Sequence, residues 1–298
     1  MSELLRGVPV ASALDGRTRE KVDKLRAAGI EPRLAMLRVG EDEGALSYER
    51  GASKRCGKAG IAVREIVLPS DVTQERLLGV IRELNDDAAV HGILMFRPLP
   101  AQLDEKAACA AVAPEKDVDG ISEGSMTKTY SGAGAGFTPC VAAAVMELLR
   151  YYNIDVGGKR AVVIGRSLAV GRPAAMLLMH ENATVTLCHS KTRDLAHISR
   201  TADIVVTAVG KGEIFGREFF REGQTVIDVG ITWSESRQKL VGDVDFEKVE
   251  PIVSAISPVP GGVGSVTSAL LAYHAAQAAE SIESSLHQVV FSEKQNQL

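Results

Sequence analysis

The stretch RAVVIGRSLAVGRP, residues 160–173, determines how the second half of this chain folds. It begins with an apolar run short enough for a buried strand, and a helical pattern starts at its end. Gly165 directly follows the strand, Gly171 stands at the helix entry, and Pro173 suits a first helical turn. A helix N-terminus at such a turn offers free N–H groups and the positive end of a dipole to phosphate. The spacing is G-x-x-x-x-x-G and not G-x-G-x-x-G, so the motif alone also fits a purely structural turn.

Strand-like runs and helical patterns alternate on both sides of this stretch. Helical patterns near 11–29, 45–59 and 73–86 separate the apolar runs 33–39, 63–68 and 92–96. A second series of apolar runs covers 160–165, 183–188, 202–209, 224–230 and 251–256, and an Ala-rich helical pattern follows to about residue 290. This alternation predicts an α/β fold with parallel sheets covered on both faces. Residues 121–140, rich in Gly, Ser and Thr and without a period, are expected to form a linker or cleft loop between two α/β units.

Length and composition exclude several classes of protein. The 298 residues suggest about two domains, and 45% hydrophobic with 24% charged residues is ordinary for a soluble globular protein. A net charge of −4 without a basic block argues against nucleic acid or an anionic membrane as a partner. The sequence shows no signal peptide and no long apolar run. Its four scattered cysteines form no C-x-x-C pair, so we expect a cytoplasmic protein with reduced thiols and no metal site.

The end of the second strand in the second series indicates which dinucleotide the site prefers. NAD-specific sites commonly place an Asp or Glu there, which accepts a hydrogen bond from the ribose 2′-hydroxyl. Here the strand ends in Cys188-His189-Ser190-Lys191, with no acid, and Arg166 can reach the same corner. Donors without an acid favour a 2′-phosphate, so the sequence predicts NADP over NAD. A solvated turn is the alternative interpretation of these four residues.

Seven stretches, taken together and in this order, resemble the methylenetetrahydrofolate dehydrogenase/methenyltetrahydrofolate cyclohydrolase family of one-carbon metabolism. They are VHGILMFRPLP (90–100), APEKDVDG (113–120), VVIGRSLAVGRP (162–173), ATVTLCHSKT (183–192), VIDVGI (226–231), VGDV (241–244) and PVPGGVG (258–264). The resemblance implies a folate-binding domain of residues 1–138 plus 270–298 and a Rossmann-type NADP-binding domain of residues 139–269. It also implies a cleft between them, a folate substrate and a homodimer.

The resemblance also assigns site residues. Gly165, Arg166 and Ser167 match the family's phosphate loop, Ser190 a contact to the 2′-phosphate, and Ile231 a backbone contact near the nicotinamide. Asp119 matches the carboxylate that binds the pterin ring, and a carboxylate can accept two N–H groups from a 2-aminopyrimidinone edge. Without the resemblance, the sequence DVDG would favour an aspartate in a turn. The glycine-rich loop near the folate is matched by Pro260, Gly261, Gly262, Val263 and Gly264, but Ser265 stands where the family usually has proline.

The N-terminal half departs from the family pattern at its chemically most important position. The family signature S-x-x-Y-x-x-x-K places Tyr and Lys four residues apart on one helix face. Tyr48 matches the tyrosine, a catalytic and substrate-binding position, whereas Ala45 replaces the serine and Ala52 the lysine. Phe96, a further expected substrate contact, stands where the family usually has the glutamine that contacts this lysine. The resemblance ties the lysine to cyclohydrolase chemistry, and a methyl group can neither donate a hydrogen bond nor transfer a proton.

These departures predict different outcomes for the two family reactions. Hydride transfer depends mainly on positioning two bound molecules, so NADP-dependent oxidation of 5,10-methylenetetrahydrofolate is expected to survive. Hydrolysis of the methenyl bridge needs an activated water and is expected to be weak or absent. One alternative is the full bifunctional enzyme, with Arg97 or a water chain replacing the lysine. Two others are a non-catalytic folate or dinucleotide binder and a different two-domain Rossmann dehydrogenase acting on a small acid.

Overall fold

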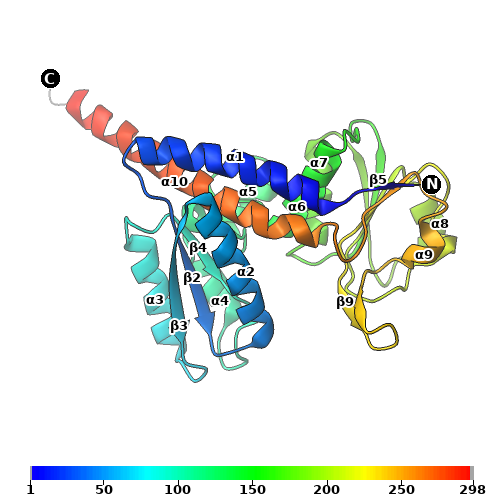
Figure 1. Cartoon of the computed structure of the whole chain (residues 1–298), viewed down its shortest axis with the longest axis horizontal. Coiled ribbons are helices and arrows are strands. Elements are labelled where there is room, and N and C mark those ends of the chain that lie inside the picture. The colour runs from blue at the N-terminus through cyan, green and yellow to red at the C-terminus, as the bar shows by residue number, and fades with distance from the viewer. Residues whose placement is uncertain (1, 296–298) are drawn as a thin grey trace. The chain divides into compact units, whose positions relative to one another are not determined.

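The computed structural model describes the backbone of residues 2–295 and the side chains of residues 2–284 (Figure 1). The chain forms two compact units, which we name by their sheets. The three-stranded unit comprises Leu14–Thr138 and the chain from Leu271 on, and the six-stranded unit comprises the chain up to Ala13 and Pro139–Leu270. Among the described helices, none is both long and apolar enough to cross a membrane.

The three-stranded unit has a parallel sheet in the order β3-β2-β4. Its strands are β2 (Arg33–Val39), β3 (Ala62–Leu68) and β4 (Gly92–Met95), and its helices include α2 (Glu43–Ala59), α3 (Gln74–Asp86), α4 (Glu105–Ala111) and α5 (Glu123–Ser131). Figure 1 shows α2 and α3 on opposite sides of this sheet. The helices α1 (Gly7–Ala27) and α10 (Gly264–Gln295) contribute their later parts to this unit. There Lys21 pairs with Glu280, and Arg17 lies over the ring of Tyr273.

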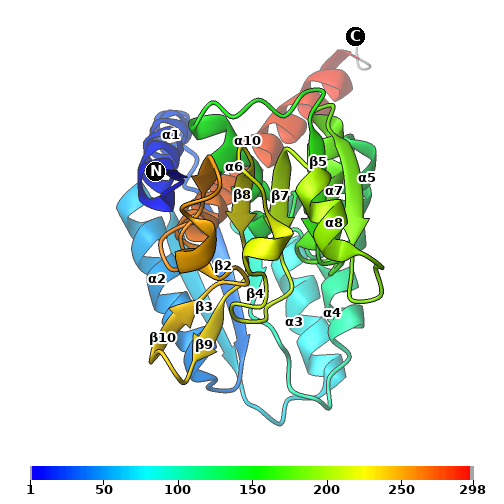
Figure 2. The same ribbon diagram turned by 90° about the vertical axis from the view of Figure 1, so that its right-hand side faces the viewer.

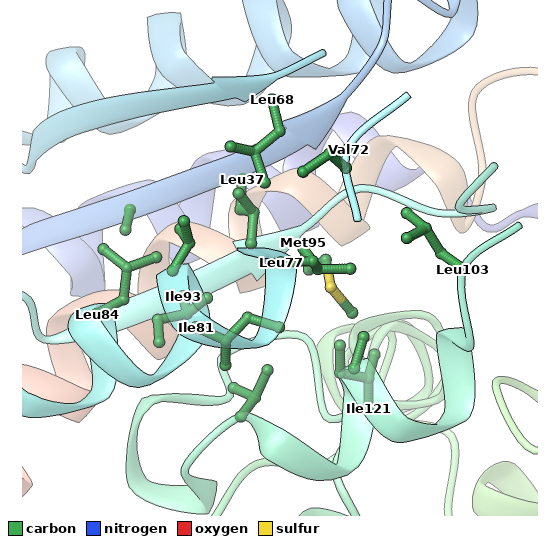
Figure 3. Close-up of a cluster of buried hydrophobic side chains, with 14 of the residues drawn as sticks. Leu37, Leu68, Val72, Leu77, Ile81, Leu84, Ile93, Met95, Leu103 and Ile121 are labelled. Atoms are coloured by element: carbon green, nitrogen blue, oxygen red, sulfur yellow. The ribbon is translucent and has the colours of Figure 1, made fainter. Parts of the chain in front are cut away.

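A single cluster of buried side chains holds α3 against the three-stranded sheet (Figure 3). Alternate residues of β2 and β4 point to this face, including Leu37 and Met95, which are register partners across the two strands. The helix α3 packs against them with Leu77, Ile81 and Leu84, which are spaced by three and four residues and therefore share one side of the helix. Burial of this apolar face holds α3 on the sheet. It thereby fixes the position of Phe96, the residue that follows β4.

The six-stranded unit is a parallel sheet in the order β1-β11-β8-β7-β5-β6. Its strands are β1 (Glu3–Leu4), β5 (Arg160–Ile164), β6 (Thr184–Cys188), β7 (Ile204–Thr207), β8 (Thr225–Asp228) and β11 (Ala255–Ile256). Its helices include α6 (Cys140–Tyr151), α7 (Gly171–His180), α8 (Leu195–Thr201) and α9 (Phe246–Val249). A short antiparallel hairpin, β9 (Thr232–Ser234) with β10 (Lys239–Val241), extends from it (Figure 2).

The expected α/β class with parallel sheets in two domains is confirmed, and the structure differs from the sequence predictions in three segments. Residues 121–140 are not an aperiodic linker, because they contain α5, whose N-terminus Ser122 caps by accepting a hydrogen bond from the Ser125 N–H. The strand expected over 251–256 is limited to β11. The first thirteen residues group with the six-stranded unit and not with the first domain, because β1 pairs with β11.

A buried carboxylate, Asp228, ties the end of β8 to the neighbouring turn. It accepts hydrogen bonds from the Thr207 hydroxyl and from the backbone N–H groups of Gly230, Asp243 and Val244. Burial raises the pKa of Asp228 to about 7, and the nearby Asp243 adds to the rise, while the hydrogen-bond donors oppose it. The folded protein therefore retains a proton at Asp228 over a pH range in which the unfolded chain has lost it.

We expect this group to make the protein less stable as pH rises from about 4 to about 7, because the fold binds the extra proton in that window. Asp228→Asn cannot ionise and should show a flatter dependence of the unfolding free energy on pH, measured by urea denaturation. Asp23→Asn makes the same chemical change at an exposed carboxylate on α1 and should keep the wild-type slope. Identical slopes for the wild type and Asp228→Asn would contradict the assignment.

Candidate active site

The glycine turn after β5 is shaped by two close backbone approaches. Gly165 has φ +129°, and a Cβ there would come closer than 3.0 Å to the Ala208 carbonyl of the loop after β7. A Cβ on Gly171 would likewise come closer than 3.0 Å to the Gly165 carbonyl. Both positions therefore require glycine, which gives the unusual G-x-x-x-x-x-G spacing a steric cause. A backbone this free of side chains can approach a pyrophosphate closely.

The helix α7 begins at this turn with its N–H groups organised by Ser167. The Ser167 hydroxyl accepts a hydrogen bond from the Val170 N–H at 3.2 Å, and the Ser167 carbonyl accepts one from the Arg172 N–H at 3.1 Å. The side chains of Arg166 and Ser167 are exposed. A helix N-terminus with an exposed guanidinium beside it suits an anionic ligand.

The structure brings the predicted 2′-phosphate corner to the same edge of the sheet. Strands β5 and β6 are parallel neighbours, and the Gly165 N–H donates to the Cys188 carbonyl at 3.0 Å. The turn that follows is closed by two hydrogen bonds, His189 N–H to the Thr192 hydroxyl and Lys191 N–H to His189 Nδ1. Ser190 is exposed at its tip. The donor-rich turn and the glycine turn thus fit a dinucleotide that carries an additional phosphate.

Ile231 lies in a constrained loop after β8, and its side chain is 58% exposed. Just before it, a Cβ on Gly230 would collide with the Asp243 carboxylate. That carboxylate accepts hydrogen bonds from the N–H groups of Val209 and Lys211. The Asp243 carboxylate therefore binds the loop after β7 and packs closely against Gly230, the residue before Ile231.

The glycine-rich loop 260–264 lies in the six-stranded unit between β11 and α10, and the N-terminal segment clamps it. The Gly7 N–H donates to the Gly261 carbonyl at 2.7 Å, and a Cβ on Gly7 would collide with the Gly262 carbonyl. Gly261 adopts φ +105°, and Val263 is buried. Pro260 and Gly264 complete the loop, and α10 starts at Gly264. The role of Gly7 was not predicted from the sequence, where nothing distinguishes it from a glycine before a helix.

In the three-stranded unit, the structure brings Tyr48 and Phe96 together. Their rings meet edge to face with centroids 6.1 Å apart, Tyr48 from α2 and Phe96 from the end of β4. Tyr48 is 38% exposed, whereas Phe96 is buried. Ala52, one turn after Tyr48, is only 1% exposed. A side chain longer than a methyl group at position 52 would therefore have to displace packed neighbours.

Asp119 lies in a turn that is stabilised by a different aspartate, Asp117. The fully buried Asp117 accepts hydrogen bonds from the N–H groups of Ile121 and Ser122. The Asp119 carboxylate instead faces Arg97, at 3.5 Å from the guanidinium, and Arg97 also lies 3.9 Å from Glu105. The sequence suggested Arg97 as a substitute for the missing lysine, and its pairing with Asp119 was not foreseen.

Arg55, a cation of α2 one turn beyond Gly51, is directed towards α1. Arg55 donates to both carboxylate oxygens of Asp15 on α1, each at 2.8 Å. Glu49, next to Tyr48, forms a buried ion pair with Arg38 of β2 at 2.7 Å, and both side chains are less than 10% exposed. This pair, which also escaped the sequence analysis, fixes α2 on the sheet. No group of His, Cys, Asp and Glu side chains within the described residues is arranged to hold a metal.

A six-stranded parallel sheet with a glycine turn at a helix N-terminus defines a Rossmann-type dinucleotide-binding domain, here with a second α/β domain. Residues 5–119 match the family model for the tetrahydrofolate dehydrogenase/cyclohydrolase catalytic domain, and residues 139–283 match the NAD(P)-binding domain model of the same family. The chain belongs to the tetrahydrofolate dehydrogenase/cyclohydrolase family.

Individual relatives agree with this assignment. The chain is 48% identical over 281 residues to the bifunctional protein FolD of Carboxydothermus hydrogenoformans, covering 94% of this chain and 98% of that protein. It superposes with a TM-score of 0.91 and 39% identity on FolD from Campylobacter jejuni, over 94% of this chain and 99% of the other. A Trypanosoma brucei FolD solved with NADP and an inhibitor gives a TM-score of 0.86 at 36% identity, covering 94% and 97%.

We expect Gly165→Ala to lower the free energy of unfolding by about 1–3 kcal/mol, because its methyl group meets backbone that cannot retreat as a side chain would. It should also abolish the thermal stabilisation that added NADP gives the wild type. Gly16→Ala in α1 makes the same chemical change where a Cβ has open space. That control should keep or slightly increase stability and retain the response to NADP. A Gly165→Ala protein with wild-type NADP stabilisation would contradict the steric account.

Proposed function

We propose that this chain is an NADP-dependent 5,10-methylenetetrahydrofolate dehydrogenase whose cyclohydrolase activity is weak or absent. The observation that carries the second part is Ala52, which is buried and lies one helical turn after Tyr48 at the position of the family lysine. The family membership and the glycine turn support the first part. Oxidation converts the methylene bridge of the folate into a methenyl bridge by loss of a hydride.

The proposed cofactor contacts come from the six-stranded unit. Bound NADP⁺ supplies the hydride-accepting nicotinamide. Gly165, Arg166 and Ser167 would hold the pyrophosphate at the start of α7, where N–H groups and a guanidinium are available. Ser190 would donate to the 2′-phosphate. The backbone of Ile231 would hold the nicotinamide side, since the preceding Gly230 N–H is fixed by the Asp228 carboxylate.

The proposed folate contacts are the residues that match the family's folate-binding positions. Asp119 would accept the two N–H groups of the pterin edge, a charge-assisted contact that its ion pair with Arg97 keeps oriented. Tyr48 and Phe96 would supply an aromatic wall, and the Tyr48 hydroxyl a hydrogen bond near the one-carbon bridge. The loop of Pro260, Gly261, Gly262, Val263 and Gly264 would line the folate with backbone. Hydride transfer then needs only the correct approach of two bound molecules.

Hydrolysis lacks a suitable group among these residues. Attack on the methenyl carbon needs a positioned water and proton transfers, which a side-chain acid or base commonly accelerates by about 10²–10⁴-fold. Ala52 has no polar atom, and Arg55 is bound to Asp15. Arg97 is engaged by Asp119 and Glu105, and a guanidinium does not give up its proton in proteins. Arg97 therefore supplies a positive charge, but neither it nor Arg55 can replace the lysine in proton transfer.

The direct test compares both half-reactions in one preparation. We expect robust NADP reduction with methylenetetrahydrofolate, slower reduction of NAD, and an enzyme-dependent decay of methenyltetrahydrofolate at least about 100-fold slower than dehydrogenation. Rapid enzyme-dependent decay would establish the bifunctional alternative. Binding of NADP and folate without any turnover would instead identify a non-catalytic binder.

Restoring the family residues at positions 52 and 96, singly and together, tests whether the missing amine or the rearranged pocket prevents hydrolysis. Ala52→Lys alone should lower thermal stability without producing hydrolysis, because the ammonium would enter a buried position beside the Phe96 and Tyr48 rings. Combined with Phe96→Gln, it gains space and a hydrogen-bond partner, and methenyl hydrolysis should rise at least about tenfold. The matched control Ala52→Met with Phe96→Gln supplies similar length without a charge and should stay inactive. Equal hydrolysis by the Lys and Met double variants would rule out the amine as the missing group.

The family membership also supports proposals about assembly, location and partners. We propose a homodimer acting in the cytoplasm, with a folate as its small-molecule substrate and no nucleic acid partner. Sedimentation of the purified protein across a concentration series measures the oligomeric state directly.

A further inference from the structure

Arg97 is held beside the proposed pterin carboxylate by the loop that follows β4. Its guanidinium lies 3.5 Å from Asp119 and 3.9 Å from Glu105. Glu105, at the start of α4, is itself fixed, because its other carboxylate oxygen accepts a hydrogen bond from the Leu99 N–H at 2.9 Å. The side chains of Arg97 and Asp119 are 30% and 24% exposed, so a ligand can reach both.

The contacts of Arg97 differ from those of the arginines that hold the three-stranded unit together. Arg38 reaches Glu49 at 2.7 Å. Arg55 reaches both carboxylate oxygens of Asp15 at 2.8 Å. Both separations of Arg97 exceed the range of about 2.7–3.2 Å that is usual for an N–H···O hydrogen bond. The two carboxylates therefore balance its charge without binding its five N–H donors tightly, and the guanidinium can donate to a ligand without breaking a structural contact.

Asp119 and Arg97 together present acceptors and donors side by side. The edge of a 2-amino-4-oxopyrimidine ring offers, in order, the amino N–H, the ring N3–H and the C4 carbonyl oxygen. A carboxylate pairs with the two N–H groups but leaves the carbonyl oxygen, an acceptor, beside its own negative charge. A guanidinium next to the carboxylate supplies the donor that this third position needs. The pair is therefore complementary to the whole edge of the ring and not only to its N–H groups.

We propose that Arg97 is a substrate-binding residue that donates a hydrogen bond to the C4 carbonyl oxygen of the pterin and selects 4-oxo over 4-amino rings. This inference rests on the proposed function, because it takes Asp119 as the pterin carboxylate. In a 4-amino ring, N3 has lost its hydrogen and an N–H donor replaces the carbonyl oxygen. Such a ring would place a donor against the guanidinium and an acceptor against the carboxylate. A site built to hydrogen-bond one group rejects an analogue that leaves its polar groups unpaired.

The test measures the binding of tetrahydrofolate and of its 4-amino-4-deoxy analogue to the full chain by calorimetry under argon. For the wild type we expect tetrahydrofolate to bind at least about 100-fold more tightly, since two contacts are reversed in the analogue. Arg97→Leu should weaken tetrahydrofolate about tenfold and leave or strengthen the binding of the analogue, so the preference falls about tenfold or more. The control Arg76→Leu removes an exposed, ion-paired arginine of α3 and should keep the wild-type preference. Thermal unfolding of both variants checks that the fold is intact.

The preference between the two ligands separates a substrate contact from an indirect role. If Arg97 only oriented Asp119, Arg97→Leu would weaken both ligands by a similar factor, and an unchanged preference of this kind overturns the proposal. Dehydrogenase activity with an unchanged preference overturns this inference alone and leaves the proposed function standing. A wild-type protein that binds neither ligand overturns the proposed function and this inference with it.

Infrared spectroscopy reads the contact directly. Tetrahydrofolate labelled with ¹³C at C4 gives an isotope-shifted carbonyl band in its complex with the protein, and a hydrogen bond from a guanidinium lowers that stretching frequency. We expect the band at a lower frequency in the wild type and in Arg76→Leu than in Arg97→Leu. The same band position in all three proteins would mean that no donor of Arg97 reaches the carbonyl oxygen, against the proposal.

Discussion

The buried ion pair between Arg38 and Glu49 is the contact on which the three-stranded unit's site depends. It joins β2 to α2. Removing either partner would leave a buried charge unpaired, which lowers the free energy of unfolding by several kcal/mol in comparable pairs. Because Glu49 follows Tyr48 directly, the pair sets how α2 lies on the sheet. The contact between the Tyr48 and Phe96 rings joins the same helix to the end of β4, the neighbour of β2 in the sheet.

The six-stranded unit relies on a different device, namely backbone groups gathered by two neighbouring carboxylates. Asp228 and Asp243 together accept most of the N–H groups exposed where β7 and β8 end. Glycines at 230 and 242 leave room for those carboxylates. The N–H groups of Val209, Lys211 and Gly230 near the proposed dinucleotide site are thus hydrogen-bonded within the protein, while the side chains of Arg166, Ser190 and Ile231 are exposed.

The sequence predicted what local patterns encode and missed what depends on distant partners. Strands such as 33–39 and the glycine turn at Gly165 follow from short apolar runs and steric need, and the structure has them. The helix over 123–131 has a weak apolar pattern and is stabilised by its Ser122 cap, so periodicity overlooked it. The partners Arg38–Glu49 and Arg97–Asp119 lie 11 and 22 positions apart, and single residues of this kind carry no signal for pairing. An arginine inside the apolar run RLAMLRV was the one available hint.

The contact between Gly7 and Gly261 joins the start of the described chain to the loop that leads into α10. The strand β1 completes the sheet edge beside β11, and the Gly7 N–H holds the loop that introduces α10. Gly7, which looks dispensable from its position near the N-terminus, is therefore bonded to a loop more than 250 positions away in the sequence. Changes to the residues around Gly7 therefore also change the packing of that glycine loop.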